Sequence, residues 1–170
     1  SKQTERWGVF EVACKGPSKG NPFTEQWIRG TFSGKSETVT ADGFYDGDGC
    51  YKVRFMPSFE GTYTYRLEAG FLEHPVTGTF QVLPASEGNH GPVRVANTYH
   101  FAYEDGTPYY SIGTTCYVWA LQSDEQIAKT LETLKNSAFN KIRFCVFPKH
   151  YDYNLGEPRS YPYEGTPMDS

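Results

Sequence analysis

The chain has 170 residues, enough for one domain with a good core or for two small ones, and its formal net charge is −4. Aromatic residues make up 16% of it, and with 17 Gly and 11 Pro this favours short strands and many turns over helical bundles or disorder. Its scattered Lys and Arg exclude a basic stripe for nucleic acid, and no apolar run approaches the roughly 20 residues that span a membrane.

Residues 6–83 contain short alternating runs that are separated by turn residues at regular intervals. Tyr51, Val53 and Phe55, for example, face one side of their run. This pattern predicts an immunoglobulin-like, antiparallel β-sandwich over residues 1–83. Its aromatic residues are expected in the core, and a carbohydrate-binding face is the alternative for four of them: Trp7, Trp27, Tyr63 and Tyr65.

An Asp/Gly-rich stretch in this half and the four cysteines of the chain each have a structural interpretation and a functional alternative. The stretch 42–49, DGFYDGDG, predicts a tight turn because Asp and Gly tolerate positive φ, and a calcium loop is the alternative, although the EF-hand spacing fails. The four cysteines lack CxxC spacing and predict small buried side chains, with a Cys14–Cys50 disulfide as the alternative. No metal site and no cofactor is therefore expected.

Residues 84–92, PASEGNHGP, are polar and rich in Gly and Pro, and they predict a linker before a second domain at residues 93–170. Beyond the linker, Asp105-Gly106 predicts a hairpin turn, and residues 109–119 predict a strand that ends in polar and aromatic side chains.

A helix is predicted after Ser123, which with Gln126 three residues later forms a capping box. Its apolar stripe is Ile127, Leu131 and Leu134. The next run, 140–147, predicts a strand covered on both faces, so the second half is one βαβ unit with a parallel pair. Because such a pair needs further strands, we expect a truncated domain, which a second copy of the chain could cover as a homo-oligomer.

Two stretches of the sequence resemble known families. Residues 43–67, GFYDGDGCYKVRFMPSFEGTYTYRL, with NPF at 21–23, closely resemble an N-terminal immunoglobulin-like domain of uncharacterised role. That domain precedes clan A glycoside hydrolase barrels in many bacterial proteins. Residues 100–119, HFAYEDGTPYYSIGTTCYVW, with the helix and NKIRF, resemble the opening of the apiosidase-like and cellulase-like (β/α)8 catalytic domain, where a hairpin plugs the barrel floor. The resemblance implies the start of an incomplete TIM barrel.

Arg143 lies in the predicted strand, where burial of its charge is costly without a partner. The resemblance implies a role for it, because the second barrel strand of these hydrolases carries an inward arginine in an N-x-I/V-R context. Asn140, Ile142 and Arg143 match that pattern. Arg143 would support a carboxylate nucleophile that this chain does not contain, since an adjacent arginine keeps a carboxyl pKa low.

Retaining hydrolysis requires two carboxylates about 5 Å apart. The resemblance places them on the fourth and seventh barrel strands, after Ser170 in sequence, so no catalytic acid or nucleophile is assigned here. The chain alone is therefore expected to be inactive. The parent protein is expected to hydrolyse glycosidic bonds of polysaccharides or oligosaccharides with retention.

Several side chains are candidates for contact with that carbohydrate substrate. Active sites of (β/α)8 barrels gather at the carboxyl ends of the strands. Thr115, Tyr117 and Trp119 end the first predicted barrel strand, with packing or a lid as the alternative for Trp119. The candidates after the second strand are His150, Tyr151 and Tyr153, for which a surface loop ordered by the remainder of the barrel is the alternative.

Two other functional classes stay open for this chain, a non-catalytic carbohydrate-binding protein and a structural module. The cellular location also stays open. Cysteines without an assigned pairing favour the cytoplasm, whereas a polysaccharide substrate favours export.

Overall fold

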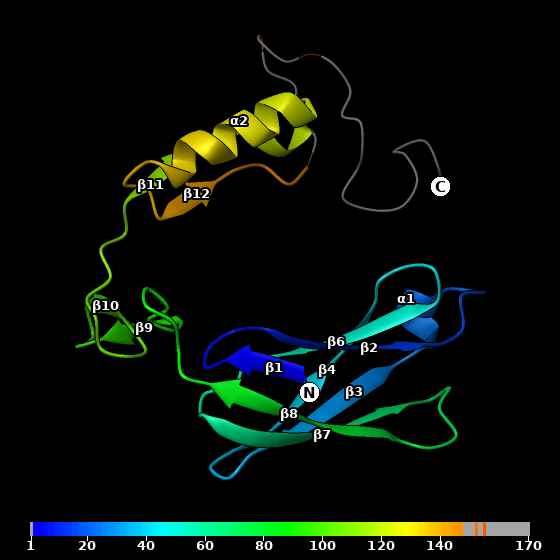
Figure 1. Ribbon diagram of the computed structural model, residues 1–170. Coiled ribbons are helices and arrows are strands. Elements are labelled where there is room, and N and C mark those ends of the chain that lie inside the picture. The colour runs from blue at the N-terminus through cyan, green and yellow to red at the C-terminus, as the bar shows by residue number, and fades with distance from the viewer. Residues whose placement is uncertain (1, 148–151, 153–154, 156–170) are drawn as a thin grey trace. The chain divides into compact units, whose positions relative to one another are not determined.

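The computed structural model describes residues 2–147, 152 and 155, and it is mainly β (Figure 1). The chain divides into two compact units, Ser1–Tyr109 and Tyr110–Ser170. The hairpin that follows the expected linker belongs to the first of these units. The domains expected from the sequence, residues 1–83 and 93–170 with a linker between them, stay a prediction.

The first unit contains two main β-sheets, and a two-stranded hairpin follows them in the chain. The larger sheet has the strand order β1-β8-β7-β3-β4, in which β1 is parallel to β8 and the other pairs are antiparallel. The smaller sheet has the antiparallel order β2-β6-β5. The strands are β1 (Lys2–Glu5), β2 (Phe10–Lys15), β3 (Ile28–Ser33), β4 (Thr38–Asp42), β5 (Phe44–Tyr45), β6 (Cys50–Phe55), β7 (Gly61–Ala69) and β8 (Val76–Leu83), and a single helical turn, α1 (Pro22–Glu25), precedes β3.

Alternating residues of both sheets form one buried core, as the sequence pattern predicts. Two stacked aromatic pairs connect the sheets: Phe32 with Phe55, whose ring centroids are 4.5 Å apart, and Phe10 with Phe80, at 3.7 Å. The remaining large members of the core are Val12, Ile28, Tyr51, Val53, Tyr63, Leu67 and Val82. The core therefore lies between the two sheets and holds them face to face.

The expectation that the aromatic residues of this unit are core is confirmed for Tyr63 and wrong for Trp27. Tyr63 is 1% exposed, and its hydroxyl donates a 2.6 Å hydrogen bond to Glu37 Oε1. Burial is the main cause that raises the pKa of Tyr63. Trp27 is 55% exposed because it lies between α1 and β3, outside the strand alternation. Tyr65 packs against the edge of the core, and the guanidinium of Arg6 stacks on the ring of Trp7.

The predicted tight turn between β5 and β6 is confirmed. Gly47, Asp48 and Gly49 all have positive φ (88°, 48° and 68°), a conformation that glycine adopts without steric cost. Asp46 forms an ion pair with Lys52, so its carboxylate already has a cationic partner.

Residues 84–92 are held by hydrogen bonds against the N-terminal strand of the first unit and the residue that follows it. The carboxylate of Glu5, at the end of β1, accepts a 2.7 Å bond from the Ser86 amide and a 2.9 Å bond from Asn89 Nδ2. Asn89 Nδ2 also donates to the carbonyl oxygen of Arg6, at 3.2 Å. The segment expected to be a linker is therefore fixed to β1 at several points.

The predicted hairpin turn at Asp105-Gly106 is confirmed, because Ala102 and Pro108 form an antiparallel bridge across it, and a second hairpin that the sequence did not predict precedes it. Strands β9 (Val93–Ala96) and β10 (His100–Tyr103) are antiparallel, and their connection contains Asn97 and Thr98 at positive φ. Asp105-Gly106 forms a second turn, in which the Gly106 amide bonds to the carbonyl oxygen of Tyr103. Asparagine tolerates left-handed backbone, so Asn97 was the overlooked turn signal.

The second unit is a strand, a helix and a parallel strand, as predicted. Its elements are β11 (Gly113–Thr115), the 3₁₀ turn η1 (Trp119–Leu121), α2 (Asp124–Lys135) and β12 (Lys141–Arg143). The predicted N-cap of α2 is confirmed, because Ser123 Oγ accepts a hydrogen bond from the Gln126 amide.

Two expectations about burial in this unit are wrong. The predicted strand over residues 140–147 ends at Arg143, and Val146 is 58% exposed. Leu131, a member of the predicted apolar stripe of α2, is 50% exposed. Both residues occupy apolar positions at which the sequence periodicity predicts burial, but no element within the described part of the unit covers them.

The four cysteines are half-buried, and Cys14, Cys50 and Cys116 are free thiols. Cys14 lies opposite Tyr51 on the β2–β6 ladder and packs against the core, while Cys50 lies opposite Lys15. Because adjacent positions on a strand face opposite sides of the sheet, the alternative of a Cys14–Cys50 disulfide is wrong. Among the described residues, no helix is long and apolar enough to cross a lipid bilayer.

Candidate functional site

The two faces of the β11–β12 pair differ in what covers them. Thr114 of β11 and two residues of α2, Thr130 and Leu134, line one hollow of about 640 Å³, so α2 lies over the Thr114 side. Thr115 and Arg143 are paired directly across the two strands. Because side chains alternate along a strand, these two occupy the opposite, uncovered face, which α2 meets only at the end of β11, where Thr115 lines a second hollow with Gln126 and Thr130. The structure thus brings together two of the side chains that the sequence indicated.

Arg143 is exposed, and no carboxylate among the described residues forms an ion pair with it. Lys141 precedes it on the same face of β12, since the side chain of Lys141 lies against Gly113 of β11. This uncovered face therefore carries two cations. An exposed guanidinium presents several donors in a fixed fork and suits a carboxylate or a similar planar anion.

Three of the predicted substrate-contacting residues line one hollow of about 490 Å³ beside the end of β11. They are Thr115, Tyr117 and Trp119. The sequence did not predict two further lining residues, Gln122 and Gln126, whose amides add hydrogen-bonding groups. The sequence pattern assigned Gln126 only to the helix cap. Polar residues that directly follow an aromatic strand end are a signal that could have indicated a place in the site.

Trp119 is held in place by the fold around it. Its indole Nε1 donates a 3.4 Å hydrogen bond to the carbonyl oxygen of Ile127, and its ring meets Phe144 edge-on at 5.2 Å. The ring is half-buried, so part of it faces the hollow. These contacts support a packing role, and contact of Trp119 with a sugar stays a prediction. His150, Tyr151 and Tyr153 lie outside the described residues.

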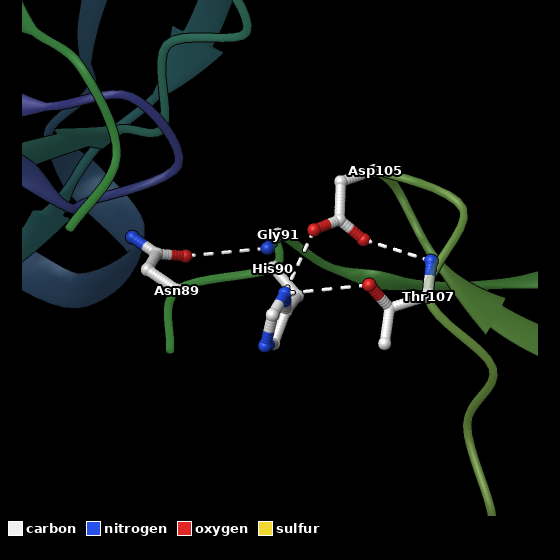
Figure 2. Close-up of polar contacts among 5 residues, drawn as sticks. All are labelled: Asn89, His90, Gly91, Asp105 and Thr107. Carbon is white, nitrogen blue, oxygen red and sulfur yellow. Dashed lines mark hydrogen bonds and ion pairs between the residues drawn. The ribbon is translucent and has the colours of Figure 1, made fainter. Parts of the chain in front are cut away.

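A second cluster of polar side chains lies in the first unit, where residues 89–91 meet the turn at Asp105 (Figure 2). Asp105 Oδ2 lies 2.7 Å from His90 Nδ1, and the other carboxylate oxygen accepts a hydrogen bond from the Thr107 amide. The hydroxyl of Thr107 lies 3.4 Å from the same Nδ1. In a catalytic triad the acid and the hydroxyl contact different imidazole nitrogens, so this cluster lacks that geometry. It is a structural connection between the 84–92 segment and the hairpin.

We expect Asp105→Asn to lower the melting temperature of the first unit at pH 6. The Thr107 amide, followed by His90, lowers the pKa of Asp105 to about 2. The stabilisation that the carboxylate provides is thus present above its ordinary pKa of about 4 and is lost as the pH falls towards 2. Thermal unfolding should be measured at pH 6, 4 and 2. The difference in melting temperature between Asp105→Asn and the unsubstituted protein should become smaller as the pH falls.

Glu87→Gln is the control for this experiment, because it removes one negative charge from the neighbouring exposed segment. Its melting temperature should match that of the unsubstituted protein at each pH. An Asp105→Asn protein as stable as this control at pH 6 would contradict the structural role of the cluster.

The described residues contain no group of three or more His, Cys, Asp or Glu side chains that could hold a metal ion.

Comparisons with known proteins relate the chain to one family model and to one solved structure. Residues 3–70 match the model of a domain of unknown function, DUF5060. The chain is also similar to the crystal structure of a protein from Bacteroides vulgatus ATCC 8482 that is described as a candidate glycoside hydrolase, with 40% identity and a TM-score of 0.89. The alignment covers 96% of this chain and 32% of that one, so this chain spans about a third of that protein's length. No curated protein matches the chain.

Proposed function

We propose that this chain is the N-terminal portion of a retaining glycoside hydrolase that acts on polysaccharides or oligosaccharides. It would supply an accessory sandwich and one wall of the active site. The observation that carries the proposal is the similarity to the Bacteroides vulgatus protein, which extends over 96% of the chain at 40% identity. The pairing of Thr115 with Arg143 on the uncovered face of β11–β12 agrees with it.

The strand orders support the immunoglobulin-like part of the proposal. Strands β3, β7 and β8 correspond to the C-F-G sheet of that architecture, and β2, β6 and β5 to its B-E-D strands. For the second unit, β11-α2-β12 has the connectivity of the first two strands of a (β/α)8 barrel. Exposed apolar side chains on this unit, such as Ile112 at 46% and Phe139 at 44%, are what further barrel strands and helices would cover.

In this proposal Arg143 contributes positive charge rather than a reacting atom. The nucleophile of a retaining glycosidase is a carboxylate that must be ionised to attack the anomeric carbon. A guanidinium close to that carboxylate stabilises its ionised form and lowers its pKa. Thr115, Tyr117 and the amides beside them would contact the sugar through hydrogen bonds, and an aromatic ring offers an apolar surface to the sugar face.

The test is a hydrolysis assay of two proteins, the 170-residue chain and the full-length product of its gene, on a panel of β-linked glycans. The proposal expects no turnover by the chain alone and turnover by the full-length protein. Proton NMR of the first-formed product should show retained anomeric configuration. Inversion, or a full-length protein without activity on any glycan, would overturn the proposal.

A second function is favoured by one observation in the first unit. Phe23 and Trp27, at the start and just after the end of α1, are 57% and 55% exposed, and exposed aromatic rings are common at carbohydrate-binding sites. A non-catalytic binding module would retard the chain in affinity electrophoresis on a soluble glycan, and Trp27→Ala would abolish the retardation. A structural module would migrate unretarded on every glycan.

A further inference from the structure

We propose that Asn140 is the positioning residue that fixes the register of β11 against β12, and thereby the face on which Arg143 lies. It directly precedes β12, and it binds the segment that leads into β11 through both its backbone and its side chain. The importance of this role for catalysis rests on the proposed function. The claim that Asn140 fixes the register does not depend on that function.

Three hydrogen bonds join Asn140 to two residues before β11. Its amide nitrogen donates to the carbonyl oxygen of Ile112, at 2.9 Å, and its Oδ1 accepts from the Ile112 amide, also at 2.9 Å. Its Nδ2 donates to the carbonyl oxygen of Tyr110, at 2.8 Å. The side-chain amide thus acts as an additional peptide group, and both backbone polar groups of Ile112 are bound by this one residue.

Few other side chains specify the register of the strand pair, apart from the edge-on contact of Trp119 with Phe144 beyond the strand ends. Each strand has three residues, and only the central one, Thr114 or Ile142, is even half-buried. Gly113 has no side chain that could distinguish one alignment from another. The register of a strand pair is normally set by a hydrophobic face and by a short turn, and here a helix of 12 residues replaces the turn. The contacts of Asn140 are therefore the most directional constraint on the pair.

A shift of one residue would reverse the face of every side chain on β12. Ile142 would move to the uncovered face, and Arg143 would move beneath α2, beside Thr114 or Cys116. The guanidinium would then lie on the wrong side of the strand for the proposed site. By holding residue 140 opposite Ile112, Asn140 places Arg143 opposite Thr115, three residues further along both strands.

The experiment is NMR on the 170-residue chain, with Asn140→Ala, Asn140→Asp and the control Asn136→Ala. Asn136 is a matched control because its Nδ2 also donates to a backbone carbonyl, that of Glu132 at the end of α2, but takes no part in the strand pair. Inter-strand Overhauser contacts report which residue lies opposite Thr115. Exchange of the Cys116 amide, which donates to the carbonyl oxygen of Arg143, reports whether the pairing persists.

The unsubstituted protein and Asn136→Ala should show Thr115 opposite Arg143 and a protected Cys116 amide. Asn140→Ala should lose those contacts, and its Cys116 amide should exchange at least about tenfold faster, as when an opening free energy falls by about 1.4 kcal/mol. Asn140→Asp keeps the acceptor for Ile112 but loses the donor to Tyr110. The exchange rate of its Cys116 amide should therefore lie between those of Asn140→Ala and the unsubstituted protein.

An unchanged register in Asn140→Ala would overturn the proposal, as would equal loss of register in Asn136→Ala, since the effect would then be one of general stability. A register that depends on Asn140, in a protein whose full-length form hydrolyses no glycan, would support the positioning role and overturn the proposed function alone.

Discussion

Phe32→Ala is expected to destabilise the first unit by about 3–5 kcal/mol, the range for truncation of a buried phenylalanine. Phe32 is 0% exposed and belongs to the larger sheet, while its stacked partner Phe55 belongs to the smaller one. It also meets Phe10 and Phe80 edge-on, at 6.4 and 6.5 Å. Truncation would leave a cavity at the centre of the core, and a loss of this size is a large part of the stability of an ordinary domain.

Urea unfolding of the chain, followed by circular dichroism, measures this effect. The control is Phe59→Ala, because Phe59 is 43% exposed and should cost less than about 1 kcal/mol. Phe32→Leu keeps most of the buried volume, so its loss of stability should lie between those of Phe32→Ala and Phe59→Ala. Equal midpoints for Phe32→Ala and Phe59→Ala would mean that the two sheets are not held together by this stacking.

On the proposed function, Arg143→Met in the full-length gene product is expected to lower kcat by about 100-fold or more, which corresponds to about 2.7 kcal/mol of transition-state stabilisation. Methionine approximates the aliphatic part of the arginine side chain but carries no charge. Without the guanidinium, the pKa of the nucleophile should rise by about 1–3 units. The acid limb of the pH profile of kcat/KM should therefore move to higher pH, while KM changes little.

Lys141→Met is the matched control, since Lys141 lies on the same strand and the same face, two residues away. Its kcat should stay within about threefold of that of the unsubstituted protein, and its acid limb should not move. Arg143→Lys keeps the charge but not the fork of donors, so its activity should lie between those of Arg143→Met and the unsubstituted protein. Equal losses for Arg143→Met and Lys141→Met would contradict a specific role for Arg143.

The core of the first unit was predictable because burial between two sheets follows the twofold period of a strand. Tyr51, Val53 and Phe55 show that period in the sequence, and all three are buried. Trp27 belongs to no such run, and its exposure depends on where α1 ends. The aromatic content of the sequence indicated a core but did not distinguish this residue from its members.

The second unit followed its sequence pattern less closely. Its connectivity was predictable from the helix cap and the flanking apolar runs. The exposure of Leu131 and Val146 was not, since an apolar pattern does not report whether another element covers it. Asn140 matched a family pattern, yet its role in the register was not foreseen. Its partners are 28 and 30 residues away, and no sequence period reports a contact of that kind.

The attachment of residues 84–92 to β1 has a practical consequence for anyone who divides this protein. A recombinant fragment ending at Leu83 would leave the Glu5 carboxylate without its two donors, Ser86 and Asn89. It would also remove Gly91, whose backbone lies so close to the Trp7 ring that no side chain fits between them. A fragment ending at Tyr109 would retain these contacts and the His90–Asp105 pair, and it should resist proteolysis where the shorter one frays.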